Sequence, residues 1–422
     1  MKGIYNDLKL SVYRDLFHKR KVLIIGSGAV GSYLMEYLSK LGVSPDTVDM
    51  DRFTLENAAK HSCLVRTPED VGRNKAECTS QRVLPLLDEG CLSNGIDTDL
   101  CNLGPEAFSD YDAVFVVVDN YAAKVLLNDL IRQLPEEQRP VVLMSGTYGE
   151  TASSVITDNK KFCLNCLINE QWMKDASIRT SCGRPQTRTI DGKTEIIRTS
   201  NLASSMAAHL SAEQFRGFIL KYPDVMNRRL AYTAYPYLEL SKEKPIAKDC
   251  CSGCKVQPPE KKIALAGTVL TKTLKQALEE IEGILGTTEF EMSVYRLNYK
   301  NIVYDGFVTD EICHSCGKTI RVMKHEGRMY DEDLMCYECR SKKAHIREEL
   351  VGNPDSVLHA FTKDCDETII NMTLYELGFP LGAHIEVIEK NGAIDFLDDE
   401  KIKKTVFYCE EDHKQMHSIH KL

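Results

Sequence analysis

The chain has 422 residues, a length typical of two or three domains, and its apolar fraction of 43% is sufficient for sizeable hydrophobic cores. A net charge of −9 argues against a nucleic-acid partner. No apolar run approaches the roughly 20 residues of a membrane span, and the charged N-terminus lacks the apolar core of a signal peptide. We therefore expect a cytoplasmic protein that binds neither nucleic acid nor membrane.

The stretch 21–51 has the pattern of a β-α-β unit that binds a nucleotide. An apolar run enters a glycine turn, a helix-like run follows, and a second apolar element ends in Asp49 and Asp51. The turn has the spacing G-x-G-x-x-G, formed by Gly26, Gly28 and Gly31. Such glycines let the backbone approach a phosphate, and the helix N-terminus stabilises the phosphate charge. An acidic residue at the end of the second strand suits ribose hydroxyls, so the pattern predicts a bound adenine nucleotide.

The following segments continue the alternation of strands and helices. We expect a polar loop at 52–75, a helix at 76–87, a buried strand at 111–119, a helix at 121–133 and a strand at 140–146. The apolar strand at 111–119 ends in an acid, which places that acid at the nucleotide crevice. The pattern predicts an α/β fold with a Rossmann-like, doubly wound and mainly parallel sheet.

Sixteen cysteines need an explanation other than disulfides if the compartment is reducing. Eight of them form four C-x-x-C pairs: Cys163/Cys166, Cys251/Cys254, Cys313/Cys316 and Cys336/Cys339. Two such pairs complete a tetrahedral zinc site. The last two pairs are separated by nineteen residues, which predicts a zinc ribbon at about 310–342. The first two pairs are distant in sequence, so their pairing into one site is the weaker inference. Cys250 adjoins Cys251 and could replace it as a ligand.

Polar and cationic residues after the second strand favour a nucleotide that reacts. The loop after Asp51 carries Asn57, Lys60 and Lys75. Hydride transfer has no use for this set, whereas attack on an α-phosphate needs positive charge where negative charge develops. A dehydrogenase remains a less favoured alternative.

The strand at 111–119 ends in a second polar group. Asp119 and Asn120 stand at its tip, with Lys124 one turn further on. An acid at this position can hold Mg²⁺ beside a triphosphate. These residues also favour ATP as a reactant.

In combination, these motifs resemble the ubiquitin-activating and ThiF-MoeB-HesA-type adenylyltransferases over roughly residues 10–255. Those enzymes adenylate the C-terminal glycine carboxylate of a ubiquitin-like or sulfur-carrier protein. The resemblance implies that the glycine turn cradles ATP, that Asp49 holds the ribose with Asp51 just behind it, and that Asp119 binds magnesium. It also implies that Lys75 is the catalytic lysine and that Asn57 lies near the phosphates. The two distant cysteine pairs match the family's zinc positions.

The chain departs from the family at two basic positions. Lys60 and Lys124 stand where arginine is usual, which weakens bidentate contacts with phosphate. Arg14 resembles an N-terminal arginine that reaches into the partner subunit's ATP site, and the family works as dimers, so a homodimer is implied. An exposed helix charge is the alternative interpretation of Arg14.

A polar, arginine-rich segment at 178–200 lacks periodicity, and we interpret it as a crossing loop (about 175–200). Cys182 lies in it, close to Arg179, Arg184 and Arg188, and nearby cations lower the pKa of a thiol. In the resembled family, a cysteine of this segment attacks the acyl-adenylate. A passive exposed cysteine is the alternative.

The expected domains are an adenylation domain at 1–255 and a C-terminal region at 263–422. Residues 372–389 resemble the end of a ubiquitin-fold domain, so we expect such a module at about 350–412. In some activating enzymes this domain recruits a conjugating enzyme.

The resemblance thus implies an activating enzyme that uses ATP, magnesium and zinc and forms a thioester on Cys182. Two alternatives stay open: a sulfur-carrier adenylyltransferase without a thioester step, and a non-catalytic nucleotide-binding scaffold.

Overall fold

The structure is a computed structural model in two compact units, each described here by itself. It describes residues 15–18, 20–55, 68–119, 121–160, 162–167, 187–190, 193–196, 200–234, 238–248, 251–294, 307–312, 316–325, 357–358, 360–390 and 404–412. The N-terminal unit takes in the described residues up to Leu100 and from Phe108 to Pro258. The C-terminal unit takes in Cys101–Ala107 and the described residues from Pro259 to Asp412.

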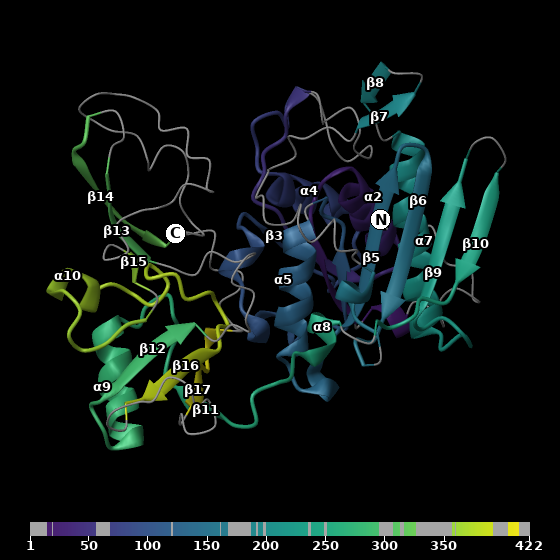
Figure 1. Cartoon of the computed structure of the whole chain (residues 1–422). Helices are drawn as coiled ribbons and strands as arrows, with labels where there is room; N and C mark the ends of the chain where they lie inside the picture. The colour runs from purple at the N-terminus through teal and green to yellow at the C-terminus, as the bar shows by residue number, and fades with distance from the viewer. Residues whose placement is uncertain are drawn as a thin grey trace. The chain divides into compact units, whose positions relative to one another are not determined.

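An eight-stranded sheet forms the centre of the N-terminal unit, with the strand order β10-β9-β6-β5-β4-β1-β2-β3 (Figure 1). Its strands are β1 Lys21–Ile25, β2 Ser44–Val48, β3 Gly95–Ile96, β4 Ala113–Val116, β5 Val141–Tyr148, β6 Thr151–Thr157, β9 Arg228–Thr233 and β10 Glu239–Glu243. Strands β3, β2, β1, β4 and β5 pair in parallel, and β6, β9 and β10 extend the sheet in antiparallel fashion. The predicted α/β fold with a mainly parallel sheet is confirmed.

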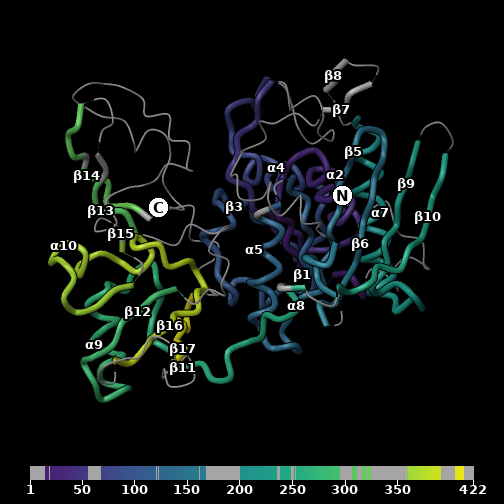
Figure 2. The backbone as a smooth tube through the Cα atoms, viewed as in Figure 1, coloured from purple at the N-terminus to yellow at the C-terminus, as the bar shows by residue number. Residues whose placement is uncertain are grey.

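Helices connect and cover these strands. In the described part of this unit, the α-helices are α2 Ala29–Lys40, α4 Lys75–Val83, α5 Tyr121–Arg132, α7 Asn201–Ile219 and the short α8 Ser252–Lys255. Short 3-10 turns occur at Leu84–Leu86, Glu136–Gln138 and Leu164–Cys166. Figure 2 traces how β9 follows α7 and pairs with β6, and how β10 then pairs with the outer side of β9.

The order of the parallel strands reverses at β1. The chain passes from β1 through α2 to β2 on one side, whereas β4 lies on the other side of β1 and continues through α5 to β5. Because crossovers between parallel strands are right-handed, α2 and α5 lie on opposite faces of the sheet. The carboxyl ends of β1 and β4 therefore border the crevice in which sheets of this kind bind ligands.

The core of the unit lies between the sheet and the pair α2 and α7. Leu34 and Leu38 of α2 are fully buried there, and the ring of Phe215 on α7 lies 5.6 Å from the ring of Phe115 on β4, centroid to centroid. Burial of each such side chain contributes about 1.5–3 kcal/mol. This packing fixes α2, and with it the glycine turn at the start of α2.

The C-terminal unit contains a four-stranded sheet in the order β11-β17-β16-β12 and a three-stranded sheet in the order β14-β13-β15. Their strands are β11 Lys262–Leu265, β12 Phe290–Val294, β13 Phe307–Ile312, β14 Thr319–His325, β15 Val357–Leu358, β16 Ile385–Glu389 and β17 Lys404–Cys409. The helices are α9 Leu274–Leu285 and α10 Glu367–Ile370. Thr273 and Gln276 form a capping box at the start of α9, and Gly286, with φ of 72°, ends the helix.

The segment Cys101–Ala107 packs within the C-terminal unit although it precedes β4 in sequence. The backbone N–H of Gly104 donates to the carbonyl of Leu381 at 2.6 Å. A Cβ at Gly104 would lie 2.3 Å from the carbonyl oxygen of Gly382, so only glycine fits this approach. Glu106 adds a hydrogen bond of 2.7 Å with buried His384 and an ion pair with Lys262.

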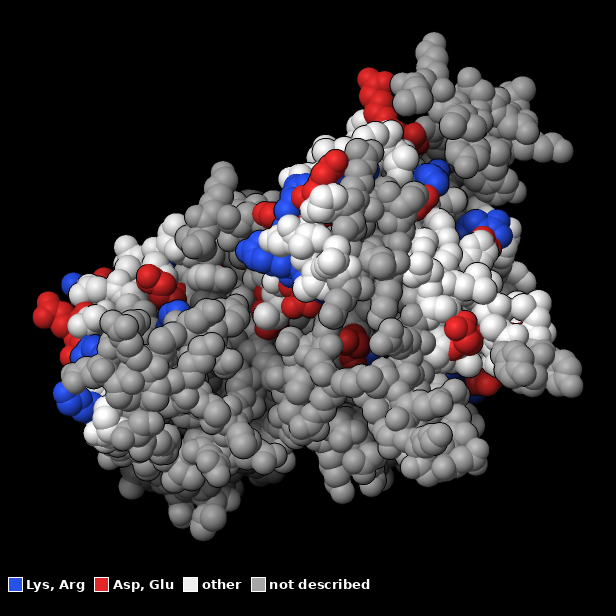
Figure 3. All heavy atoms as spheres, turned by 90° about the horizontal axis from the view of Figure 1, so that it is seen from above, with Lys and Arg blue, Asp and Glu red and all other residues white. Residues whose placement is uncertain are grey.

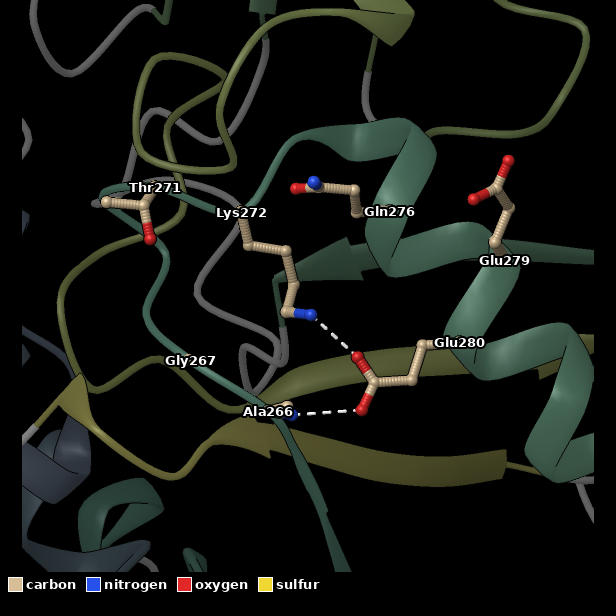
Figure 4. A pocket seen from close by; sticks show the side chains of 7 residues that line it. All are labelled: Ala266, Gly267, Thr271, Lys272, Gln276, Glu279 and Glu280. Carbon is tan, nitrogen blue, oxygen red and sulfur yellow. Dashed lines mark hydrogen bonds and ion pairs between the residues drawn. The ribbon is translucent and has the colours of Figure 1, made fainter.

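An open hollow of about 630 Å³ lies beside α9 in this unit (Figure 4). The Glu280 carboxylate accepts from the ammonium of Lys272 at 2.6 Å and from the backbone N–H of Ala266 at 2.9 Å. These contacts lower the pKa of Glu280 although partial burial opposes the shift. Within the described lining, the lysine and the carboxylate therefore satisfy each other.

Two segments differ from the sequence-based expectations. Strands β7 Thr187–Ile190 and β8 Lys193–Ile196 pair as an antiparallel hairpin inside the crossing loop, where no regular structure was expected. Strands β16 and β17, which lie within the module expected at 350–412, share their sheet with β11 and β12, which precede it. The sheet of that module therefore draws on residues from 262 onward.

Candidate nucleotide and metal sites

The glycine turn joins β1 to α2 with three different backbone requirements. Gly26 has φ of 101°, a conformation that residues with a Cβ rarely adopt. A Cβ at Gly31 would lie 2.0 Å from the carbonyl oxygen of Gly26, so this glycine permits close packing of the helix on the turn. A Cβ at Gly28 would meet no atom within 4 Å. The space beside Gly28 is thus open to a ligand.

The N-terminus of α2 faces this open space without a protein cap. Within the described chain, no side chain caps the helix at Gly28, and its first turn carries no acid. The first N–H groups of a helix lack intrahelical acceptors and carry partial positive charge. An anion such as a phosphate fits this terminus.

Asp49 lies beside the turn, at the end of β2. Its carboxylate accepts from the backbone N–H of Ser27 at 2.6 Å and from that of Asp51 at 2.8 Å. Burial raises the pKa of Asp49 to about 6, while nearby Lys75 and the two backbone hydrogen bonds oppose the shift. The carboxylate is therefore held rigidly beside the open space at Gly28, where a sugar hydroxyl could reach it.

Lys75 is the first residue of α4, and its side chain is buried. Its ammonium forms an ion pair of 2.9 Å with the carboxylate of Asp51. Asn74 caps α4 by accepting from the backbone N–H of Glu77, and its amide donates to the carbonyl oxygens of Asp49 and Asp51. Asn74 therefore ties the start of α4 to the end of β2 and fixes the lysine beside both acids.

A second buried lysine lies past the end of β4. Asp119 is exposed, and Lys124 is buried on α5, with its ammonium 4.7 Å from the centroid of the Tyr121 ring. Burial lowers the pKa of Lys124 to about 8, and the charge of Asp119 opposes this shift. An exposed acid and a buried cation thus follow the central strand, in a position suited to a metal-bound polyphosphate.

Four cysteines from two distant segments meet in this unit. The sulfurs of Cys163, Cys166, Cys251 and Cys254 all lie within 4.8 Å of one another. Four of the Sγ–Sγ distances within the cluster lie between 3.3 and 3.9 Å. Tetrahedral zinc with Zn–S bonds of about 2.3 Å requires sulfurs about 3.8 Å apart, so this donor set fits zinc. The cysteines pack against the apolar side chains of Val155, Phe162 and Met144.

This chain matches a known protein family. A model described as the ThiF family matches residues 5–313. The chain belongs to the ThiF family. The match extends past residue 255, the predicted end of the adenylation domain.

Three curated relatives align with part of this ThiF-family chain. The chain is 32% identical over 130 residues to the adenylyltransferase and sulfurtransferase MOCS3 of Caenorhabditis briggsae, covering 30% of this chain and 31% of that protein. It is 31% identical over 136 residues to the tRNA threonylcarbamoyladenosine dehydratase of Haemophilus influenzae, covering 31% of this chain and 49% of that protein. It is 25% identical over 166 residues to ubiquitin-activating enzyme E1 1 of Candida albicans, covering 36% of this chain and 16% of that protein. The chain therefore spans less than half the length of each.

In this ThiF-family member, the described residues bring together much of the predicted nucleotide site. Gly26, Gly28, Gly31, Asp49, Asp51 and Lys75 form one cluster around the start of α2, and Asp119 and Lys124 follow β4. Five other predicted residues lie outside the described part of the chain: Arg14, Asn57, Lys60, Asn120 and Cys182. Their roles stay predictions.

The predicted zinc ribbon is described only in part. Cys316 is exposed in the connection between β13 and β14, which pair as a hairpin. The other three cysteines, Cys313, Cys336 and Cys339, lie outside the described residues. The second zinc site stays a prediction.

Asn74 and Tyr121 were missed by the sequence analysis. Asn74 had a local signal, because asparagine followed three residues later by Glu77 is a helix N-terminal pattern. No comparable signal marked Tyr121, whose role depends on the position of Lys124.

The remaining surface and helices give two general observations. On the face shown in Figure 3, the described basic and acidic side chains lie interspersed. None of the helices in the described part of the chain is both long and apolar enough to cross a membrane.

Proposed function

We propose that this chain is an ATP-dependent adenylyltransferase that activates the C-terminal carboxylate of a ubiquitin-like protein and then receives the acyl group as a thioester on Cys182. The observation that carries the proposal is the ion-paired, buried Lys75 beside Asp49 and the open helix terminus of α2. This arrangement combines a phosphate cradle, a ribose-binding acid and a cation for developing phosphate charge. Family membership and the relatives MOCS3 and E1 1 support it.

In the first step, a carboxylate oxygen of the partner attacks the α-phosphorus of ATP. A new P–O bond forms, and the bond between the α-phosphorus and the α,β-bridging oxygen breaks. Pyrophosphate leaves with the electron pair of that bond. The Lys75 ammonium stabilises the negative charge that develops on the α-phosphate oxygens. Asp49 holds the ribose, and the N–H groups at the start of α2 hold phosphate oxygens.

Magnesium bound by Asp119 would neutralise charge on the departing pyrophosphate. Lys124 lies one helical turn beyond and adds a cation on the same side. Lys60 is proposed to contact the phosphates with Asn57, and Arg14 is proposed to reach the site of a second copy of the chain in a homodimer.

In the second step, the thiolate of Cys182 attacks the acyl carbon of the adenylate. The C–S bond forms, the bond to the AMP phosphate oxygen breaks, and AMP leaves. The C-terminal region is proposed to bring a conjugating enzyme to the thioester. We place the protein in the cytoplasm, where reduced cysteines can hold zinc.

Two other functions share the first step or its nucleotide site. A sulfur-carrier adenylyltransferase would release pyrophosphate without forming a carrier thioester, as the similarity to MOCS3 suggests. A scaffold would bind ATP without releasing pyrophosphate, and the lysines at positions 60 and 124 motivate that alternative.

The test is non-reducing electrophoresis of the purified chain with ATP, magnesium and a lysate of its source organism, beside Cys182→Ala. We expect an ATP-dependent, thiol-sensitive adduct whose mass exceeds that of the chain by the mass of one ubiquitin-like protein. This adduct should be absent from the variant. Pyrophosphate release without an adduct would indicate the sulfur-carrier function. Binding of ATP with neither signal would indicate the scaffold.

A further inference from the structure

Helix α5 carries a buried polar stripe along its length. Lys124, Asn128 and Arg132 follow one another at intervals of four residues, and they are 8%, 0% and 4% exposed. Residues at this spacing lie on one side of a helix, and eight residues span about 12 Å. Lys124 is one of the basic residues of the proposed ATP site. The other two contact the segments that hold the four cysteines.

Asn128 contacts both cysteine segments. Its side-chain oxygen accepts from the backbone N–H of Leu164, which lies between Cys163 and Cys166, at 3.0 Å. A Cβ at Gly253, between Cys251 and Cys254, would lie 2.6 Å from the Asn128 amide nitrogen. The glycine of the second C-x-x-C pair is therefore required for this close approach. Figure 1 shows the short helix α8, which contains Gly253, beside α5.

Arg132 connects the end of α5 to the second cysteine segment. Its guanidinium donates to the carbonyl oxygen of Cys254 at 2.8 Å, to that of Val256 at 3.2 Å, and to that of Asn159. Asn159 lies between β6 and the first cysteine pair. One buried cation therefore fixes three carbonyl groups around the cluster, and loss of its side chain would leave those carbonyls without this donor.

We propose that Asn128 and Arg132 are positioning residues of the four-cysteine site, and that α5 couples zinc binding there to nucleotide binding at Lys124. The coupling part rests on the proposed ATP site. Zinc fixes two segments that are distant in sequence, and the bonds to Asn128 and Arg132 then order the C-terminal half of α5. A nucleotide that orders Lys124 meets a helix already held at its other end, so each ligand lowers the ordering cost of the other.

The first experiment needs no variant. The zinc affinity of the wild-type chain is measured in a metal buffer that fixes free Zn²⁺, with excess Mg²⁺, with and without α,β-methylene-ATP. The buffer removes the effect of zinc chelation by the nucleotide, and the zinc lost in Cys251→Ser identifies the signal of this site. We expect the nucleotide analogue to tighten zinc binding about fivefold. If the analogue binds and zinc affinity stays the same, the coupling is wrong.

The second experiment compares Arg132→Met with Arg216→Met. Arg216 lies on α7 and pairs with Glu213, so its loss leaves the cysteine segments untouched. We expect Arg132→Met to weaken zinc binding about 10–100-fold, the usual effect of losing an outer-shell partner, and to remove the effect of the analogue. The control should retain both. Equal zinc affinity in the two variants would overturn the positioning role.

Lys124→Met separates the inference from the proposed function. We expect this variant to bind the analogue more weakly while its zinc affinity without nucleotide matches wild type. If wild type itself binds no analogue, the proposed function has failed, and the effect of Arg132→Met on zinc affinity still decides the positioning role. If Lys124→Met alters zinc affinity as strongly as Arg132→Met, the stripe acts in folding alone and the inference is wrong.

Discussion

The candidate nucleotide site and the four-cysteine site lie in the same unit and differ in their electrostatic surroundings. At the nucleotide site, Asp49 and Lys124 carry shifted pKa values because burial disfavours their charged forms, and the α2 terminus is open. At the cysteine site, sulfurs lie among apolar side chains, and Arg132 holds the surrounding carbonyls. The first site is suited to a charged ligand that binds and dissociates, and the second site is suited to a permanently bound structural metal ion.

The largest effect should come from removing a cysteine. Cys251→Ser is expected to lower the zinc content by one ion per chain and to reduce the free energy of unfolding by at least about 3 kcal/mol, because a structural metal supplies folding energy. Elemental analysis and denaturant unfolding measure the two quantities. Cys365→Ser, at a half-buried cysteine outside the pairs, is the control. Unchanged zinc content in Cys251→Ser would contradict the assignment.

Lys75→Met should affect reaction far more than stability. Loss of a cation that stabilises developing charge is expected to slow pyrophosphate release about 10²–10³-fold, with ATP still bound. The matched control is Lys40→Met on α2, where the exposed lysine pairs with the buried Glu36 at 2.6 Å. Pyrophosphate release is followed with a coupled assay at saturating ATP. A change equal to that of the control would remove Lys75 from the proposed chemistry.

Two glycines of one turn should respond in opposite ways. Gly31→Ala places a Cβ against the carbonyl of Gly26 and is expected to destabilise the fold by about 2–4 kcal/mol. Gly28→Ala meets no protein atom, so the fold should keep its stability while ATP affinity falls by at least about tenfold. Thermal unfolding and calorimetric titration with ATP separate the two effects. Equal loss of stability in both variants would show that the space at Gly28 is needed for folding alone.

Local sequence patterns and long-range contacts explain what could be predicted. The glycine turn, Asp49 and Asp119 are marked by spacing within one β-α-β unit or at one strand end, so sequence indicated them. Arg132 could not be identified, because its acceptors at Asn159, Cys254 and Val256 are distant along the chain. Gly104 is a similar case, since its partner Gly382 comes from the far end of the sequence.

The missed hairpin β7–β8 teaches a different lesson. Its sequence contains Asp191 and Gly192 between the two strands, a pair typical of tight hairpin turns. The arginine-rich composition of the surrounding segment obscured this local signal. The four-cysteine site is intermediate in how far the sequence could predict it. Each C-x-x-C pair is a local pattern, and only the pairing of the two depends on the fold.

The smallest expected effect is a pH dependence of nucleotide affinity. Burial raises the pKa of Asp49 to about 6, so its carboxyl group is mostly ionised at pH 7 and mostly protonated at pH 5. If the ionised form holds the ribose hydroxyls, ATP affinity should fall about tenfold between pH 7 and pH 5. Stability should change in the opposite direction: a folded-state pKa above the unfolded value of 3.8 means that this group's contribution is lost as pH rises toward 6.

The control for that measurement is 2′,3′-dideoxy-ATP, which has the same phosphates and lacks the ribose hydroxyls. Titration of the phosphates and of Lys124 affects both nucleotides alike, so the ratio of their affinities isolates the contact with Asp49. We expect ATP to bind more tightly than the dideoxy nucleotide at pH 7 and the preference to shrink by about tenfold at pH 5. A constant ratio across this range would mean that Asp49 serves the turn through Ser27 and has no contact with the sugar.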